Sequence, residues 1–125
     1  MTQEKEDPEE KLNLSILITP NGFTLTGADK VLPPDSETDG PRIPCLDAGC
    51  RSPESYDYHA LTERLKKVKD RYESEENVIF VPDGGVPYEV LVLTMDAARD
   101  DQEDKDDQGK ARTLFPYVVI AAGVQ

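Results

Sequence analysis

Residues 12–26 carry the pattern that most constrains the fold, two alternating apolar stretches joined by a tight turn. Apolar side chains stand at every second position of the first stretch: Leu12, Leu14, Ile16 and Ile18. Successive side chains of a strand point to opposite faces, so this period predicts a strand with one buried face. Pro20-Asn21-Gly22 can reverse the chain, and residues 23–26 alternate again. The sequence therefore predicts an N-terminal β-hairpin over 12–26.

Helices and strands are expected in alternation after this hairpin. Apolar residues recur at three- and four-residue steps over 57–72 and 87–99, which is the period of an amphipathic helix. Lys66, Lys67 and Lys69 of the first helix are expected to face solvent. The apolar runs 77–81 and 114–122 favour strands buried on both faces, joined by a right-handed parallel crossover. We expect an α/β fold of the α+β two-layer kind, a small mixed sheet with two helices packed on one face.

Two segments, interpreted as insertions, interrupt this order, and both are longer than the compact pattern of the family whose resemblance is described below. The segment 27–56 contains Pro33-Pro34 and Pro41-x-x-Pro44, which exclude a continuous helix or a central strand and predict a long loop. The segment 100–112 opens with an acidic run that is expected to remain a hydrated loop. Residues 1–11 are charged, without apolar periodicity, and are expected to be a flexible lead-in. The remainder, 12–125, is expected to form one domain.

Charge and composition argue against several classes of function. The formal net charge of −12 disfavours nucleic-acid binding, which needs clustered Lys and Arg. The chain as given has no apolar run near the roughly 20 residues of a membrane span, so we expect it to be soluble. His59 is the only histidine, and no base–nucleophile motif accompanies it. Cys45, Cys50 and His59 give at most three zinc ligands, so no catalytic, cofactor or metal residue is predicted.

The spacing of Cys45 and Cys50 leaves two readings open. Pro44 and Gly49 can turn the chain between them, so a disulfide would fit, and two reduced thiols in a loop would fit as well.

The position of the segment 114–122 in the sheet is also left undecided by the sequence. This segment is long and nearly uncharged, with Pro116 near its start, and could be an edge strand that accepts another strand or a central strand.

A motif near residue 90 resembles the periplasmic domain of the ExbD/TolR family of biopolymer transport proteins. The second helix of that domain commonly opens with Val-Pro-Tyr and closes with Met-Asp-Ala-Ala. This chain has Val86, Pro87 and Tyr88, then Met95 and Asp96 followed by two alanines. The strand 78–81 followed by Asp83, the pair Leu61 and Leu65, and the closing segment 115–123 are consistent with the same family pattern.

The resemblance implies a non-catalytic periplasmic module of an inner-membrane motor driven by the proton motive force, anchored by a transmembrane helix that this sequence lacks. Family members pair with an ExbB/TolQ-like membrane partner. They act on a TonB/TolA-like protein, a periplasmic peptide or peptidoglycan. Gliding-motility and nutrient-uptake motors are both compatible. No residue here corresponds to the family's proton-carrying aspartate.

An oxidising periplasm favours the disulfide between Cys45 and Cys50. The family also favours homodimers that take up an extended partner segment, so we expect a weak dimer whose interface or peptide groove includes a strand edge. The residues expected at that edge are Leu114, Phe115, Tyr117, Val118, Val119 and Ile120. The alternative function is a stand-alone acidic adaptor or regulatory binding domain without a motor. An enzyme is the weakest hypothesis.

Overall fold

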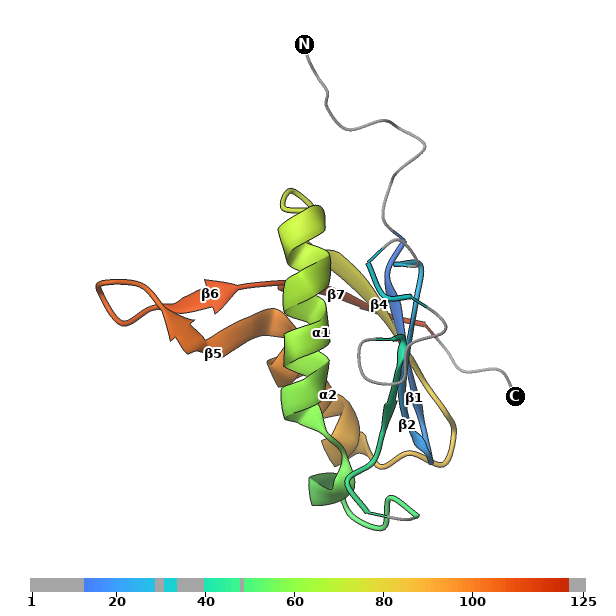
Figure 1. Ribbon diagram of the computed structural model, residues 1–125. Helices are drawn as coiled ribbons and strands as arrows, with labels where there is room; N and C mark the ends of the chain where they lie inside the picture. Colours follow the sequence, from blue (N-terminus) through green and yellow to red (C-terminus); the bar gives the residue numbers. More distant parts are fainter. Residues whose placement is uncertain (1–12, 29–30, 34–39, 48, 122–125) are drawn as a thin grey trace.

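A mixed sheet with α1 and α2 on one face forms the body of the protein (Figure 1). The computed structural model describes residues 13–28, 31–33, 40–47 and 49–121. Within these residues the elements are β1 (Ser15–Thr19), β2 (Gly22–Thr26), β3 (Arg42–Pro44), the short 3₁₀ helix η3 (Pro53–Ser55), α1 (Tyr58–Arg71), β4 (Asn77–Pro82), α2 (Tyr88–Arg99), β5 (Asp100–Lys105), β6 (Ala111–Thr113) and β7 (Tyr117–Ile120). The main sheet has the order β3-β2-β1-β4-β7, and β5 pairs with β6 in a separate two-stranded sheet.

The N-terminal β-hairpin is confirmed. β1 and β2 pair antiparallel with Thr19 opposite Gly22, so Pro20 and Asn21 form the connecting turn. Gly22 has a φ of +132°, and a Cβ at this position would collide with the carbonyl oxygen of Ile43. Glycine is therefore required both by the backbone conformation and by the approach of β3. The predicted start of the hairpin at Leu12 lies outside the described residues.

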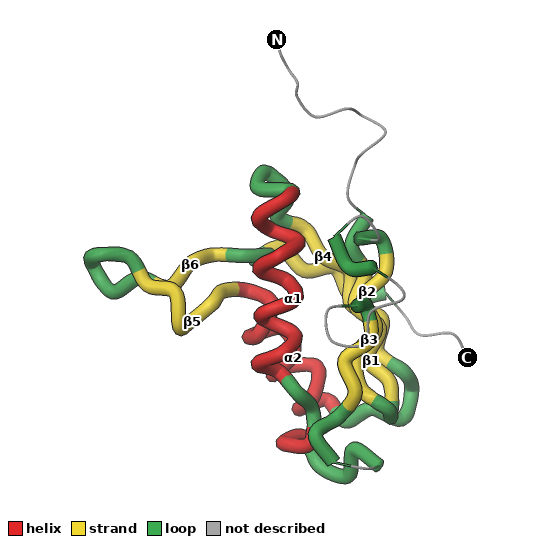
Figure 2. Tube along the Cα trace, in the orientation of Figure 1, coloured by secondary structure: helices red, strands yellow, loops and turns green. Residues whose placement is uncertain are grey.

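β4 lies inside the sheet next to the β7 edge, parallel to β1 on one side and to β7 on the other. Val78 and Phe80 of β4 are fully buried under the helices. Ile79 points to the opposite face and is 36% exposed. The expectation that 77–81 is covered on both faces is therefore wrong. Because α1 and α2 occupy the same side, the described elements leave the other face of the sheet open (Figure 2).

The predicted helices are also confirmed, with ends that their sequences explain. Asp57 precedes α1, and its side chain accepts a hydrogen bond from the backbone N–H of Ala60 at 3.0 Å. Such a cap satisfies a donor that the first helical turn leaves unpaired. Pro87 precedes α2, where its missing N–H costs nothing. The hydroxyl of Thr62 donates to the carbonyl of Ala97 at 2.9 Å and ties α1 to α2.

Lys69 of α1 is buried, which corrects the expectation that it faces solvent. Its exposed fraction is 8%, and its ammonium donates to the backbone oxygen of Glu75 at 2.6 Å. The same nitrogen lies 5.3 Å from the centre of the Phe115 ring. Burial lowers the pKa of Lys69. A long aliphatic stem lets lysine cover apolar surface while its charge finds a polar partner, so helical periodicity alone could not place this side chain.

The acidic segment forms a β-hairpin and not the expected irregular loop. β5 and β6 pair antiparallel, with an irregular register between Asp101 and Lys105. The hairpin projects sideways from the body of the protein (Figure 1). Most of β5 is exposed, as its charges require, but Asp101 is only 2% exposed. Its carboxylate lies 3.1 Å from the ammonium of Lys66, and this interaction raises the pKa of Lys66.

We predict that the Lys66→Met variant is less stable than the wild type by about 1 to 2 kcal/mol, because it leaves the buried Asp101 carboxylate without its cation. Chemical denaturation of both proteins measures the difference. Adding Asp101→Asn to the Lys66→Met protein removes the isolated charge and should restore part of the loss. Equal stability of Lys66→Met and wild type would show that the ion pair does not hold the hairpin to α1.

Candidate functional site

β7 forms one edge of the main sheet in the described part of the chain. The strand within the segment 114–122 is therefore an edge strand over Tyr117–Ile120, one of the two positions that the sequence left open. It is not buried as expected, because Tyr117, Val119 and Ile120 are 60%, 58% and 50% exposed. Ala122 lies outside the described residues. A sheet edge with three large exposed side chains is unusual for a strand that has no partner.

β7 is held firmly at its start and along its inner side. Leu114 and Phe115 are fully buried, and their N–H groups donate to the carbonyls of Arg99 and Ala98 at 2.8 and 3.0 Å. These two residues belong to the core and not to the edge for which they were predicted. Pro116 follows them and β7 begins. The strand is thus anchored by apolar packing and backbone hydrogen bonds before it reaches the surface.

The backbone of β7 presents unused hydrogen-bonding groups outward. The N–H of Tyr117 donates to Glu76 and that of Ala121 donates to Phe80, at 3.1 and 2.9 Å. Backbone groups of a strand alternate in direction, so the amides and carbonyls of Val118 and Ile120 point away from β4. Groups in this orientation are the ones to which an added strand would bind.

At the opposite edge of the sheet, a proline reduces the number of backbone N–H groups that another strand could bind. β3 is three residues long and pairs antiparallel with β2. The carbonyl of Pro41 accepts from Leu25 and the N–H of Cys45 donates to Asn21, so Arg42 and Pro44 face away from β2. Pro44 has no N–H to offer to another strand. Among the described strands, β7 therefore provides the better edge for pairing.

An apolar surface adjoins the β7 edge on the open face of the sheet. Ile79 is paired in register with Val119, and Asn77 with Tyr117. Leu17 and Val81, also in register with each other, are half-buried on the same face. This surface and the β7 edge together form what we call the β7 site, consisting of Leu17, Ile79, Val81, Tyr117, Val118, Val119 and Ile120. A partner that adds a strand to β7 could also cover these side chains.

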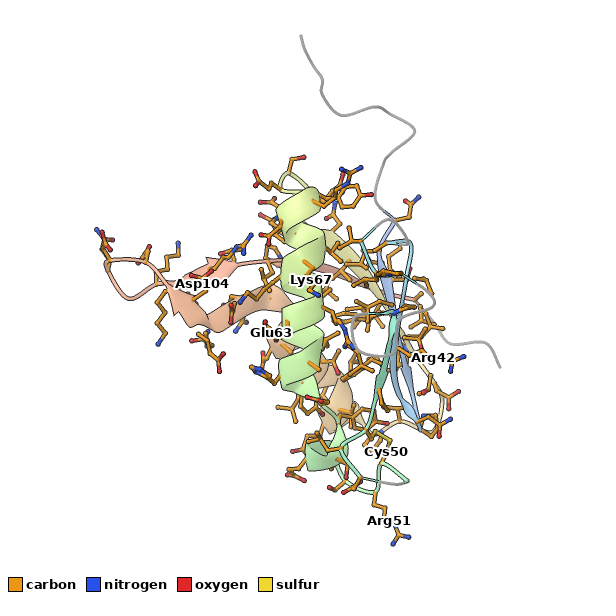
Figure 3. The ribbon with its side chains drawn as sticks, viewed as in Figure 1. Arg42, Cys50, Arg51, Glu63, Lys67 and Asp104 are labelled. Atoms are coloured by element: carbon orange, nitrogen blue, oxygen red, sulfur yellow. A yellow bond between two sulfur atoms is a disulfide. The ribbon has the colours of Figure 1, made fainter. Side chains whose placement is uncertain are left out.

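The disulfide between Cys45 and Cys50 is present, with Cα atoms 5.6 Å apart. It closes the loop that links β3 to η3, in the lower part of the molecule and away from the β5–β6 hairpin (Figure 3, where Cys50 is labelled). Among non-glycine described residues, Cys50 alone has a positive φ, of 45°. This φ lies in the left-handed region, which residues other than glycine seldom adopt.

Aromatic packing attaches this disulfide loop to the sheet. Phe23 lies 5.3 Å from Tyr56 and 5.8 Å from Tyr58 between ring centres. The hydroxyl of Tyr56 donates to the carbonyl of Thr19 at 2.6 Å, and that of Tyr58 donates to the carbonyl of Pro53 at 2.8 Å. Burial raises the pKa of Tyr58 to about 12, so this ring stays neutral and keeps donating across the physiological range.

The motif residues on and before α2 have mainly structural positions. Val86 and Met95 pack against the core, while Pro87 precedes the helix. Asp96 forms an exposed ion pair with Arg99 at 3.8 Å. Tyr88 is the exception, because it is 77% exposed at the start of α2. The motif residues lie in the helical layer, and the β7 site lies on the sheet. The family-motif residues and the predicted edge-strand residues therefore do not form a single site.

Sequence reasoning missed one group of side chains that could hold a metal ion. His59 and Glu63 lie one turn apart on α1, and Glu103 reaches them from β5. The first two share the four-residue spacing that places side chains on one helical face. Glu103 could not be assigned to this group from the sequence, because the acidic segment that contains it was expected to form no regular structure.

Comparisons of the chain with protein-family models, with curated proteins and with solved structures found no match. The likeness to the ExbD/TolR family therefore rests on the residues of the α2 motif and on the order of the elements. None of the helices in the described ranges combines the length and the apolar character that crossing a membrane requires.

We predict that replacing both cysteines, Cys45→Ser with Cys50→Ser, lowers the free energy of unfolding by about 2 kcal/mol, because the short loop regains its entropy in the unfolded chain. Urea denaturation without reductant measures this loss. Adding reductant should destabilise the wild type by a similar amount and leave the double variant unchanged. Labelling of thiols in the folded, unreduced wild type should find none, and two labelled thiols would contradict the bridge.

Proposed function

We propose that this protein is a non-catalytic binding module that associates through the β7 site with a second copy of itself or with an extended segment of a partner. The observation that carries this proposal is the exposed edge of β7. The outward N–H and C=O groups of Val118 and Ile120 provide main-chain hydrogen bonds for an added strand. Tyr117 and Val119 provide apolar contacts beside it.

The rigidity of β7 supports this role. Leu114 and Phe115 fix the start of the strand in the core, so little conformational entropy remains to be lost there when a partner binds. The accessible apolar side chains are few and the edge is four residues long, which suits a weak and reversible interaction. A weak dimer was the expectation from the sequence, and this geometry supports it.

We further propose that the module is the periplasmic part of an ExbD/TolR-like motor driven by the proton motive force, where it binds an envelope partner and transmits force. The α2 motif and the order of hairpin, helix, strand, helix and strand support this proposal. The disulfide suits an oxidising compartment. A binding module in such a motor needs a stable body and a separate attachment surface, which the core and the β7 site would supply.

We predict that the Ile120→Pro variant loses self-association while it keeps its fold. Proline removes the outward N–H of Ile120 and is tolerated where a strand faces solvent. The Ile120→Thr variant keeps the amide and the β-branched shape, so it serves as the matched control and should still associate. Sedimentation velocity over a range of concentrations measures association, and thermal denaturation verifies the fold. Association of folded Ile120→Pro equal to that of wild type would remove β7 from the interface.

The motor proposal makes a separate prediction about the gene. The full coding region should place one apolar helix of about 20 residues, bearing an aspartate, before Met1. Sequencing upstream of the codon for Met1 tests this directly. A coding region without such a helix would favour the stand-alone adaptor and would leave the β7 site as a binding surface.

A further inference from the structure

His59, Glu63 and Glu103 bring a nitrogen and carboxylate oxygens together at the base of the β5–β6 hairpin. One ligand atom from each residue lies within 4.8 Å of the others. The Nδ1 atom of His59 is 3.9 Å from Oε2 of Glu103. Figure 3 shows Glu63 on the side of α1 that faces the hairpin. The cluster therefore joins two elements that are distant in sequence.

The spacing of these atoms is close to what a metal ion requires. Zinc binds histidine nitrogen and carboxylate oxygen at about 2.0 to 2.2 Å with tetrahedral angles, so neighbouring ligand atoms are about 3.4 Å apart. The side chains of His59 and Glu103 are 66% and 70% exposed, and that of Glu63 is 44% exposed. Small rotations of exposed side chains can bring the three ligands to this distance. Water can occupy the fourth position.

A network beneath the cluster positions both carboxylates. The buried Asp101 accepts a hydrogen bond from the backbone N–H of Glu103 at 3.1 Å, which fixes the backbone that carries this ligand. The other carboxylate oxygen of Asp101 lies 3.1 Å from the ammonium of Lys66. Lys66 also lies 3.6 Å from Glu63, so the same network reaches the second carboxylate. Supporting contacts of this kind orient metal ligands and increase affinity.

The charges around the cluster favour a divalent cation. Glu63 and Glu103 contribute two negative charges, and the ammonium of Lys66 lies 3.6 Å from Glu63. Its shorter contact is with Asp101, whose charge balances it. Asp104, the next acidic residue along the hairpin, faces Arg112 at 4.0 Å instead. The cluster thus keeps a net negative charge that a divalent ion would neutralise.

We propose that His59, Glu63 and Glu103 form a binding site for a divalent first-row transition-metal ion such as Zn²⁺. The imidazole distinguishes this site from a calcium or magnesium site, where oxygen ligands predominate. Glu103 belongs to the hairpin and the other two ligands to α1, so a bound ion fastens the hairpin to the helix. This link would add to the Lys66–Asp101 ion pair and to the hydrogen bond of 2.7 Å from Arg112 to Asp70, which already connect the hairpin to α1.

Isothermal titration calorimetry of the untagged, chelator-treated protein with ZnCl₂ tests the site. We expect one saturable site per chain in the wild type, and affinity at least tenfold weaker, in order of magnitude, in the His59→Ala and Glu103→Gln variants. The Asp104→Asn variant is the matched control, because it removes the same charge as Glu103→Gln from the same hairpin. It should bind Zn²⁺ like the wild type.

Two results would overturn the proposal. One is the absence of saturable binding in the wild type. The other is equal affinity in the wild type, His59→Ala and Glu103→Gln, which would indicate diffuse attraction of the ion to an acidic surface. A parallel titration with Co²⁺ adds a direct readout, because absorption bands of tetrahedral Co²⁺ should appear in the wild type and be lost in His59→Ala. All variants change exposed side chains, and circular dichroism verifies that each is folded.

Discussion

The parallel pairing of β1 with β4 is the contact on which the rest of the structure depends. It joins the N-terminal hairpin to the strand–helix–strand half of the chain, and it places Ile16 and Ile18 beside Val78 and Phe80 in a single apolar layer. α1 covers this layer as the crossover between the two strands, and α2 follows on the same side. Pairing β1 with β4 closes the long stretch of chain between them, which costs conformational entropy. Dense apolar packing between the strands and the helices must offset this cost. β7 then pairs with the other side of β4.

Local sequence patterns predicted the parts of this fold that are stabilised by local periodicity. The hairpin follows from alternation and its turn, and α1 and α2 follow from three- and four-residue spacing with Asp57 and Pro87 at their starts. The fold class was predicted correctly for the same reason. The disulfide was open from spacing alone and was favoured by the family resemblance. These features need few residues from elsewhere in the chain, so one stretch of sequence contains most of the information.

The features that escaped prediction depend on what a segment meets in three dimensions. The acidic run looked like a loop because its charges repel, yet the contact of Asp101 with Lys66 and the pairing of β5 with β6 give it regular structure. Lys69 was expected outside because lysine usually is, yet Glu75 and Phe115 provide partners for its charge. The position of β7 at an edge could not be decided from its composition, and the grouping of His59 with Glu103 required the hairpin itself. Partners far away in the sequence contribute to these cases, as Lys66 does for Asp101 and Phe115 does for Lys69.

The proline at β3 has a consequence for any assembly that would form through β7. If both sheet edges could accept a strand, copies could join head to tail and the contact would repeat without end, as in a fibre. Pro44 removes an outward donor from the β3 edge and leaves β7 as the edge better suited to pairing. If the β7 edge of one copy pairs with the β7 edge of another, neither edge can accept a further strand. The two copies are then related by twofold symmetry. If the proposed association takes place in this way, it would stop at a closed pair, because Pro44 removes one of the donors that a further strand would need at the β3 edge.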